Sequence, residues 1–113
     1  MFVTRFAPSP TGPLHLGHAY SAILAHDKAR AAGGHFLLRM EDTDLDRCRP
    51  EWDSLIQEDL LWLGLTWDGP IHRQSQHIAS YNTRLETLAG TGLLYPCSCT
   101  RTDIRAALAA PQE

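Results

Sequence analysis

The sequence lacks the features that would place it in a membrane or outside the cell. No apolar run approaches the roughly 20 residues that a membrane-spanning helix needs. The N-terminus has no basic segment followed by an apolar stretch, so we expect no signal peptide. Only 3 cysteines are present, an odd number that does not make a disulfide framework. We therefore expect a cytoplasmic protein with no membrane partner.

The sequence also lacks a dominant charge. Its 113 residues carry 10 Lys and Arg against 13 Asp and Glu, which leaves a formal net charge of -3. This balance excludes a uniformly basic coat for nucleic acid, although it allows a local basic strip. Hydrophobic residues make up 43% and charged residues 20%, as is typical of a globular protein rather than a disordered chain.

The hydrophobic pattern predicts alternating strands and helices. Phe2 to Ala7 is short and apolar, so we expect a largely buried strand that contains Arg5. A helix is expected from Leu16 to the Gly33-Gly34 pair, and His35 to Met40 is the next strand candidate. A strand, a helix and a strand in this order form a βαβ unit, which implies a parallel sheet with a right-handed crossover.

Apolar stripes at helical spacing indicate which helix faces should pack on the core. In the first helix the stripe consists of Leu16, Tyr20, Ile23 and Leu24. In the helix that Pro50 opens, the expected core residues are Trp52, Leu55, Ile56, Leu60, Trp62 and Leu63. The stripe of a third helix consists of Ile78, Tyr81, Leu85 and Leu88. Elsewhere we expect irregular structure over residues 66–75, a short strand at residues 93–95 and a final helix over residues 102–109.

The strongest functional signal is the segment from Arg5 to His18, which reads RFAPSPTGPLHLGH. A strand here delivers a proline-rich loop to the first turn of a helix, where unpaired N–H groups and the positive end of the helix dipole favour a phosphate. His15 and His18 share one face of that turn, and Gly17 leaves room beside them for a flat base. Hydrogen bonds from the two imidazoles would stabilise charge that builds on the phosphate in a transition state.

The four residues HLGH leave several interpretations open by themselves. They also fit two surface histidines beside a packing glycine, and they fit the wider group of nucleotidylyl transferases. The proline-rich string before them is much more specific, and it favours a nucleotide-binding function.

The whole segment resembles the signature of the glutamate-specific class I aminoacyl-tRNA synthetases, whose HIGH motif corresponds to residues 15–18. The resemblance continues through residues 36–44, which read FLLRMEDTD and are similar to the family's FLLRIEDTD, and through residues 61–68 and 74–76. It covers the chain from Phe2 to Ile104. It implies an α/β fold: a Rossmann-like parallel sheet with flanking helices, the first half of a class I catalytic domain.

By this resemblance, residues 1–113 form part of that catalytic domain, and an inserted segment begins near residue 93. A doubly wound sheet needs more strands than the chain supplies, so we expect a longer parent protein. The only lysine is Lys28, and the lysine loop that the family supplies after the second half of the domain is not found. We therefore expect activity in the parent rather than in the 113 residues alone.

The activity that the resemblance implies is the ATP-dependent activation of glutamate to glutamyl-adenylate, with Mg2+ accompanying ATP, followed by transfer to a tRNA. Residues 97–101 and 68–76 look more like the short paralogue of the family, which lacks an anticodon-binding domain and places glutamate on queuosine in tRNA(Asp). The alternative is a full-length enzyme that charges tRNA(Glu). Another HxGH nucleotidylyl transferase and a non-catalytic binding module are further alternatives. We expect a monomer.

The resemblance also implies roles for individual residues. His15 and His18 are the expected catalytic residues, and Gly17 completes the expected ATP site with them. Arg5 is expected to meet the side-chain carboxylate of glutamate, and Glu41 is expected to pair with its ammonium group. The other residues expected to line the glutamate pocket are Phe6, Ala7, Pro8 and Ser9.

Structural interpretations of the charged positions stay open at this point. Arg5 could form a salt bridge with a neighbouring acid. Glu41, Asp42 and Asp44 could form a solvated acidic turn, which suits Asp42 and Asp44 better than Glu41. Glu41 follows the second strand directly, and ligands of open α/β sheets bind at the carboxyl ends of the strands.

Cys97 and Cys99 form a C-x-C pair, which is a weak zinc signal because two small residues on a strand give the same pattern. Related synthetases bind zinc with such a pair, so the resemblance implies a Zn2+ site here. A structural zinc needs four ligands, and the other two would lie beyond Glu113 or come from elsewhere. Cys48 stands alone in a charged turn and is expected to have no role.

Overall fold

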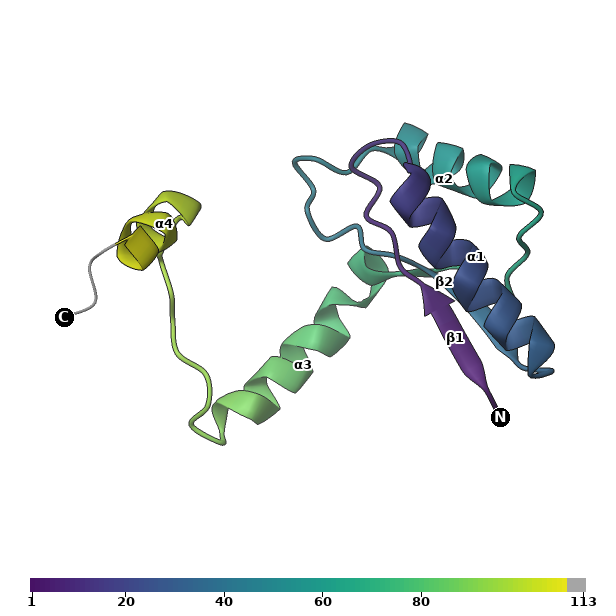
Figure 1. The fold of residues 1–113 in the computed structure, drawn as a ribbon. Coiled ribbons are helices and arrows are strands. Elements are labelled where there is room, and N and C mark those ends of the chain that lie inside the picture. The colour runs from purple at the N-terminus through teal and green to yellow at the C-terminus, as the bar shows by residue number, and fades with distance from the viewer. Residues whose placement is uncertain (110–113) are drawn as a thin grey trace. The chain divides into compact units, whose positions relative to one another are not determined.

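The computed structural model describes residues 1–109, which form a small parallel sheet and a series of helices (Figure 1). In chain order the elements are β1 (Val3–Phe6), α1 (Leu16–Ala31), β2 (His35–Met40), α2 (Pro50–Trp62), β3 (His72–Arg73), the 3-10 helix η1 (Gln74–His77), α3 (Ile78–Ala89) and α4 (Arg101–Ala109). They belong to two compact units, which meet in sequence between Ile78 and Ala79. Within the described residues, no helix is both long and apolar enough to cross a membrane.

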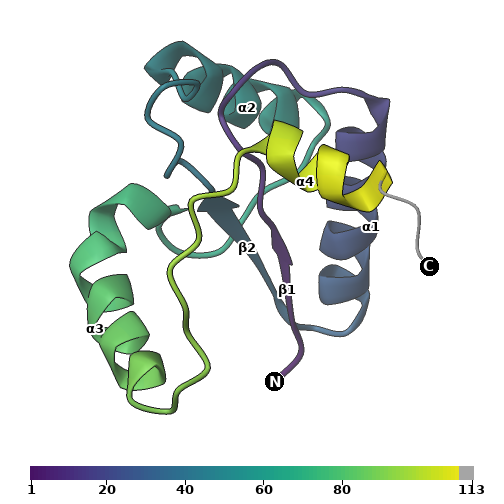
Figure 2. The same ribbon diagram turned by 90° about the vertical axis from the view of Figure 1, so that its left-hand side faces the viewer.

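The sheet of the first unit is parallel, with the strand order β1-β2-β3. Val3 lies opposite His35 and Phe6 opposite Leu38, so β1 and β2 end next to each other (Figure 2). The predicted βαβ unit is confirmed. The expectation of irregular structure over residues 66–75 is wrong in part, because β3 and the start of η1 lie there. Two residues of strand are too few to produce a recognisable alternation in sequence.

The hydrophobic core lies on one face of this sheet. Alternate side chains of β2 are buried, namely those of Phe36, Leu38 and Met40. They form one cluster with Phe6 of β1 and with residues of both α1 and α2. In α2 the predicted stripe is confirmed, since Ile56 and Leu60 are completely inaccessible to solvent.

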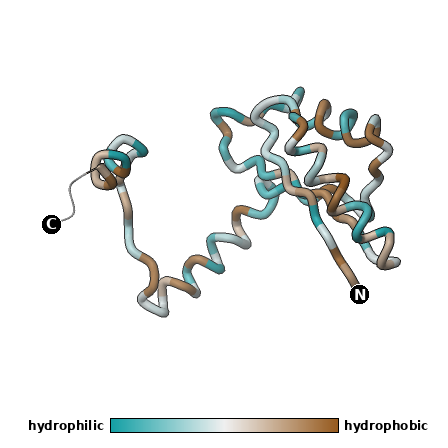
Figure 3. Tube along the Cα trace, viewed as in Figure 1, coloured by the Kyte–Doolittle hydropathy of each residue, from teal (hydrophilic) through white to brown (hydrophobic). Residues whose placement is uncertain are grey.

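The predicted core face of α1 is wrong. Leu16 is 89% exposed and Tyr20 is 68% exposed, whereas the residues that α1 buries are Ala22 and Ala29. Small side chains let a helix backbone approach the sheet closely, so the alanine row faces the core and the larger apolar residues lie elsewhere on the helix. Trp62 at the end of α2 was also expected in the core, but it is 85% exposed. Apolar residues accordingly run along both helices as well as the strands (Figure 3).

The turn from α1 into β2 needs both of its glycines. Gly33 has a φ of 59°, a left-handed conformation that side chains disfavour. A Cβ at Gly34 would collide with the carbonyl oxygen of Phe2. That same carbonyl accepts a hydrogen bond from the N–H of His35 at 2.9 Å. The predicted end of the helix at this glycine pair is therefore also the point where β2 joins β1.

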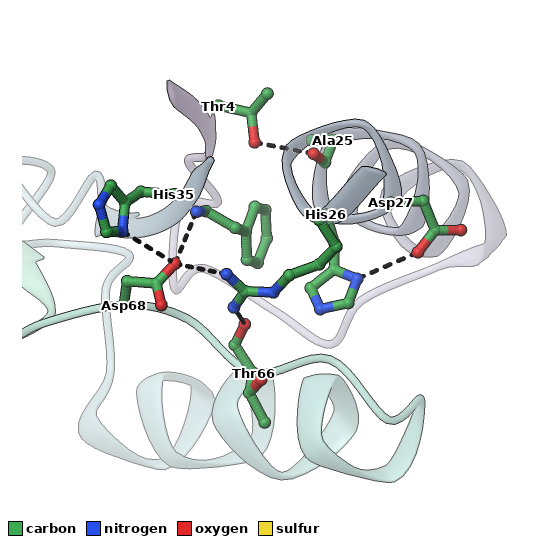
Figure 4. A network of polar contacts seen from close by, with 9 residues as sticks. Thr4, Ala25, His26, Asp27, His35, Thr66 and Asp68 are labelled. Carbon is green, nitrogen blue, oxygen red and sulfur yellow. Dashed lines mark hydrogen bonds and ion pairs between the residues drawn. The ribbon is translucent and has the colours of Figure 1, made fainter. Parts of the chain in front are cut away.

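Asp68 connects the segment after α2 to α1 and β2 (Figure 4). Its carboxylate accepts hydrogen bonds from the Arg30 guanidinium at 2.7 Å and from the backbone N–H of Phe36 at 2.8 Å. Arg30 also donates to the carbonyl of Thr66 at 2.7 Å. The hydrogen bond from Arg30 and then that from Phe36 lower the pKa of Asp68. The ionised Asp68 carboxylate therefore stabilises the folded state. This stabilisation is present above the pKa that Asp68 has in the unfolded chain, and it is lost as the pH falls through the lower pKa of the folded state.

The second unit contains α4 and all of α3 except Ile78. Residues 93–100 have no regular structure and are exposed, so the predicted strand at residues 93–95 is wrong. A strand needs a neighbour for its backbone hydrogen bonds, and the described part of this unit contains none. The predicted final helix is confirmed as α4, whose start is fixed by Thr100 and Asp103, each accepting the other's backbone N–H. The predicted start of an inserted segment near residue 93 stays a prediction.

Candidate functional site

The loop that follows β1 is tied to the residue that follows β2. The backbone N–H of Glu41 donates to the carbonyl oxygen of Pro8 at 2.9 Å, and the N–H of Arg49 donates to that of Pro10 at 3.1 Å. Both prolines are buried, so the loop is stiff as well as anchored. Pro8, in the segment from Arg5 to Ser9, is thereby held next to the acidic residue Glu41, where β1 and β2 end.

The two histidines of the HLGH segment form a stacked pair at the first turn of α1. Their ring centroids are 3.8 Å apart and the ring planes differ by 24°. His15 is the N-cap of the helix: its Nδ1 accepts the N–H of Gly17 at 3.1 Å, and the Nδ1 of His18 accepts the N–H of His15 at 3.3 Å. Because each Nδ1 accepts a hydrogen bond, each neutral ring carries its proton on Nε2. The helix caps thus fix both histidines as Nε2–H donors.

Burial lowers the pKa of His18 from its ordinary value of 6.5, and the adjacent His15 lowers it further. His18 is therefore a neutral donor at neutral pH. The folded protein binds this proton less tightly than the unfolded chain does. The stability from this effect is present above pH 6.5 and declines as the pH falls through the lower, folded pKa.

Gly17 packs against the ring of His15. A Cβ at this position would lie 3.1 Å from Cε1 and 3.2 Å from Nδ1 of that ring. These distances are tighter than ordinary van der Waals contact, so any side chain at this position would press on the histidine. A stacked histidine pair therefore gives a reason for glycine here, while the room for a flat base stays a prediction.

The expectation of a largely buried first strand is wrong, because Phe6 is the one buried residue of β1 and both Val3 and Arg5 are exposed. Thr4 and Phe6 of β1 face α1 and the core, whereas Arg5 projects from the other face, opposite Leu37 of β2. Within residues 1–109 no carboxylate forms an ion pair with Arg5. Among these residues, the alternative of a structural salt bridge at Arg5 is therefore not observed.

Glu41 and Asp42 each have a partner that the sequence did not reveal. The Glu41 carboxylate accepts a hydrogen bond from Arg39 of β2. Asp42 accepts two hydrogen bonds from Ser75 of η1, so a solvated turn is the wrong description of Asp42. Asp44 fits that description better, because its side-chain partner is the exposed Arg47 at 2.7 Å. Ser75 lies in the Gln74 to Gln76 segment of the resemblance, which was the one signal that could have singled it out.

Two hollows adjoin these residues. The larger, of about 440 Å³, lies between the start of α1 and the end of α2 and falls in the size range of ligand pockets. Its lining is mainly apolar and consists of Leu14, His15, Leu16, Ala19, Asp59, Trp62 and Leu63. The smaller, of about 170 Å³, lies beside the contact between Asp42 and Ser75 and also reaches Cys48.

Cys97 and Cys99 are both exposed. Hydrogen bonds from Cys99, through its backbone and its side chain, lower the pKa of the Cys97 thiol, which favours the thiolate that binds metals. In the part of the chain that the structure describes, no group of three or more His, Cys, Asp or Glu side chains is arranged to hold a metal ion. The pair therefore offers two donors of the four that zinc requires. Burial raises the pKa of the Cys48 thiol, consistent with an inert cysteine.

The family model for the catalytic domain of class I tRNA synthetases, E and Q, matches residues 1–110. The chain therefore belongs to this family, and the expected fold class is confirmed.

Two relatives and one solved structure make the similarity more specific. A glutamyl-Q tRNA(Asp) synthetase of Rhodobacter capsulatus is 61% identical over 98% of this chain and 40% of that protein. A glutamate–tRNA ligase of Symbiobacterium thermophilum is 46% identical over 86% of the chain and 22% of that protein. A glutamate tRNA ligase from Elizabethkingia meningosepticum, solved in complex with its amino acid, superposes with a TM-score of 0.79 at 37% identity, over 93% of this chain and 22% of that one. The chain thus spans less than half the length of these proteins.

Proposed function

We propose that the complete protein carrying this sequence activates glutamate with ATP and transfers it to queuosine in tRNA(Asp). The observation that carries the proposal is the hydrogen bond from Glu41 to Pro8, which places the residue after β2 beside the loop that runs from Arg5 of β1 to the start of α1. The choice of acceptor rests on identity, which is 61% to a glutamyl-Q tRNA(Asp) synthetase and 46% to a glutamate–tRNA ligase. A cytoplasmic location and a monomeric state stay predictions from the sequence.

Glutamate recognition follows from the charges at this edge. Arg5, exposed and without an ion pair among residues 1–109, offers its planar fork to the side-chain carboxylate. Glu41 offers its carboxylate to the ammonium group, which would share it with Arg39 or displace that side chain. Phe6 to Ser9 lie between these two charges in the chain. The side chains of Phe6 and Pro8 are buried, so Ala7 and Ser9 are the residues of this segment that would line the pocket.

Adenylate formation needs positioning and charge stabilisation more than a side-chain base. An oxygen of the glutamate α-carboxylate attacks the α-phosphorus of ATP, a new O–P bond forms, and pyrophosphate leaves with the electrons of the bond that breaks. The Nε2–H groups of His15 and His18 donate to the phosphate oxygens as charge builds on them. An acceptor hydroxyl then attacks the carbonyl carbon and releases AMP. Mg2+ would accompany ATP. The described residues contain no cluster of three or more His, Cys, Asp or Glu side chains that could hold a metal ion.

The function is tested by two assays on the complete protein. We expect ATP–pyrophosphate exchange that depends on glutamate, and transfer of labelled glutamate to tRNA(Asp) that contains queuosine. tRNA(Asp) without queuosine and tRNA(Glu) are the matched acceptors, and neither should be charged. Charging of tRNA(Glu) instead would favour the glutamyl-tRNA synthetase alternative. Exchange with a pantetheine or nicotinate compound rather than glutamate would indicate another nucleotidylyl transferase.

Replacing either histidine should slow adenylate formation more than it weakens glutamate binding. Loss of one hydrogen bond to a charged phosphate costs on the order of 2 kcal/mol, or about thirtyfold in the pre-steady-state rate, for both His15→Ala and His18→Ala. His15→Ala also removes the cap of α1, so His15→Asn is the informative companion: it keeps a cap acceptor but lacks the Nε2–H donor. His26→Ala, on the same helix, is the control. Unchanged rates in both alanine variants would refute the assignment.

Reversing the charge of Arg5 or Glu41 should abolish glutamate-dependent exchange while the protein stays folded. Arg5 is exposed and forms no ion pair within residues 1–109, so Arg5→Glu should leave the thermal midpoint of unfolding nearly unchanged. Circular dichroism melts alongside the exchange assay separate the two effects. If Arg5→Ala unfolds the domain, Arg5 is structural. If glutamine replaces glutamate readily in the wild type, Arg5 does not read the carboxylate.

We further propose that Cys97 and Cys99 supply two of four zinc ligands in the complete protein. After dialysis, elemental analysis should find one zinc per complete protein and well under one in the 113-residue chain, because two thiolates do not close a tetrahedral shell. Cys97→Ser and Cys99→Ser should each release the metal, whereas Cys48→Ser should not. Stoichiometric zinc in the short chain would contradict this ligand count, and a zinc-free complete protein would leave the pair without a metal role.

A further inference from the structure

Asp42 joins the end of β2 to η1, which lies 33 residues further along the chain. Its Oδ1 accepts the backbone N–H of Ser75 at 2.8 Å, and its Oδ2 accepts the Ser75 hydroxyl at 2.6 Å. Burial acts to raise the pKa of Asp42, but the two bonds from Ser75, with help from the nearby Arg73, lower it on balance. The carboxylate is therefore ionised, and both of its oxygens are already used within the protein.

Ser75 is itself held at a fixed point. Arg73, two residues earlier, donates to both carboxylate oxygens of Asp53 in α2, at 3.0 and 2.9 Å. The Asp53 side chain is only 17% exposed, and Gln57 of the same helix also donates to it. This bidentate ion pair anchors β3 and η1 to α2, so a group bonded to Ser75 is bonded to the body of the first unit.

Glu41 stands between two such attachments. Its own N–H is bonded to the carbonyl of Pro8, and the side chain of the next residue is bonded to Ser75. The side chain of Glu41 is held less completely. Arg39 donates to it through one terminal nitrogen, while the Nε of Arg39 is buried without a partner in the described structure. The backbone attachments therefore do most to set where the Glu41 carboxylate lies.

We propose that Asp42 is a positioning residue, which fixes the backbone of Glu41 through Ser75 and so places the carboxylate that receives the substrate's ammonium group. This inference rests on the proposed function of Glu41. In this proposal Asp42 acts on Ser75, to which both of its oxygens are bonded, and not on the substrate. Its effect comes through geometry: a displacement of about 1 Å in a positioning group can cost on the order of a hundredfold in rate.

Kinetics of glutamate-dependent exchange in the complete protein test the proposal. In Asp42→Ala we expect the KM for glutamate to rise about tenfold, an effect within the range for misplaced groups, with the KM for ATP unchanged. Ser75→Ala should also raise the KM for glutamate, and the double variant should have a KM no higher than that of Asp42→Ala. Ser75→Thr keeps the hydroxyl, so its KM should equal that of the wild type. Asp44→Ala, in the same acidic segment but with the exposed Arg47 as its ion-pair partner, is the control for charge. Additive effects, or equal changes in both KM values, would overturn the proposal.

Amide hydrogen exchange supplies a measurement that does not depend on activity. In Asp42→Ala the N–H of Glu41 should lose protection, because its bond to Pro8 is no longer supported from the following residue. The N–H of Phe36, which is bonded to Asp68, should keep its protection and serves as the internal control. Unchanged protection at Glu41 would overturn the positioning role. A wild type without glutamate-dependent exchange would instead refute the proposed function, and the protection of Glu41 would still show whether Asp42 fixes its backbone.

Discussion

The hydrogen bond from the N–H of Glu41 to the carbonyl of Pro8 is the constraint on which the candidate site depends. It spans 2.9 Å and joins the loop after β1 to the residue after β2. Two neighbouring parallel strands end at the same edge, but their side chains converge only if the loops that follow are held together. The buried prolines make one of these loops stiff, and the attachment of Asp42 to Ser75 restrains the other. The backbone segments that carry Arg5 and Glu41 therefore belong to one connected frame.

One face of the same sheet packs on the core, and the other face is exposed. The face that carries Phe36, Leu38 and Met40 is fully buried, and these side chains form one apolar cluster with residues of α1 and α2 that stabilises the sheet. The other face carries Arg5 and Leu37, both exposed. Because strand side chains alternate, one short strand can place an apolar anchor and a charged ligand group at adjacent positions. Phe6 and Arg5 are such a pair, which explains why a charged residue is tolerated inside an apolar segment.

Sequence patterns predicted features set by local spacing and missed features set by distant contacts. The Ile56 and Leu60 stripe and the paired faces of His15 and His18 follow from helical periodicity, and both were predictable. The packing of α1 through Ala22 and Ala29 was not, because alanines carry little hydrophobic signal beside Leu16 and Tyr20. Ser75, the partner of Asp42, lies 33 residues away, and Phe36, a partner of Asp68, lies 32 residues away, so no local pattern predicts these contacts. Arg5 was misjudged because an apolar run does not say which side of a sheet each residue takes.

The electrostatics of the α1 N-terminus favour a developing charge over a static one. The helix dipole and unpaired N–H groups supply positive potential there, while the lowered pKa of His18 keeps that ring neutral. A protonated pair of stacked imidazoles would bind a resting triphosphate tightly and lower the ground state as much as the transition state. In the proposed reaction, Nε2–H donors fixed in tautomer by the cap bonds through Nδ1 would gain most as negative charge grows on the phosphate oxygens. The capping interactions that start the helix therefore also set the tautomer of its two histidines.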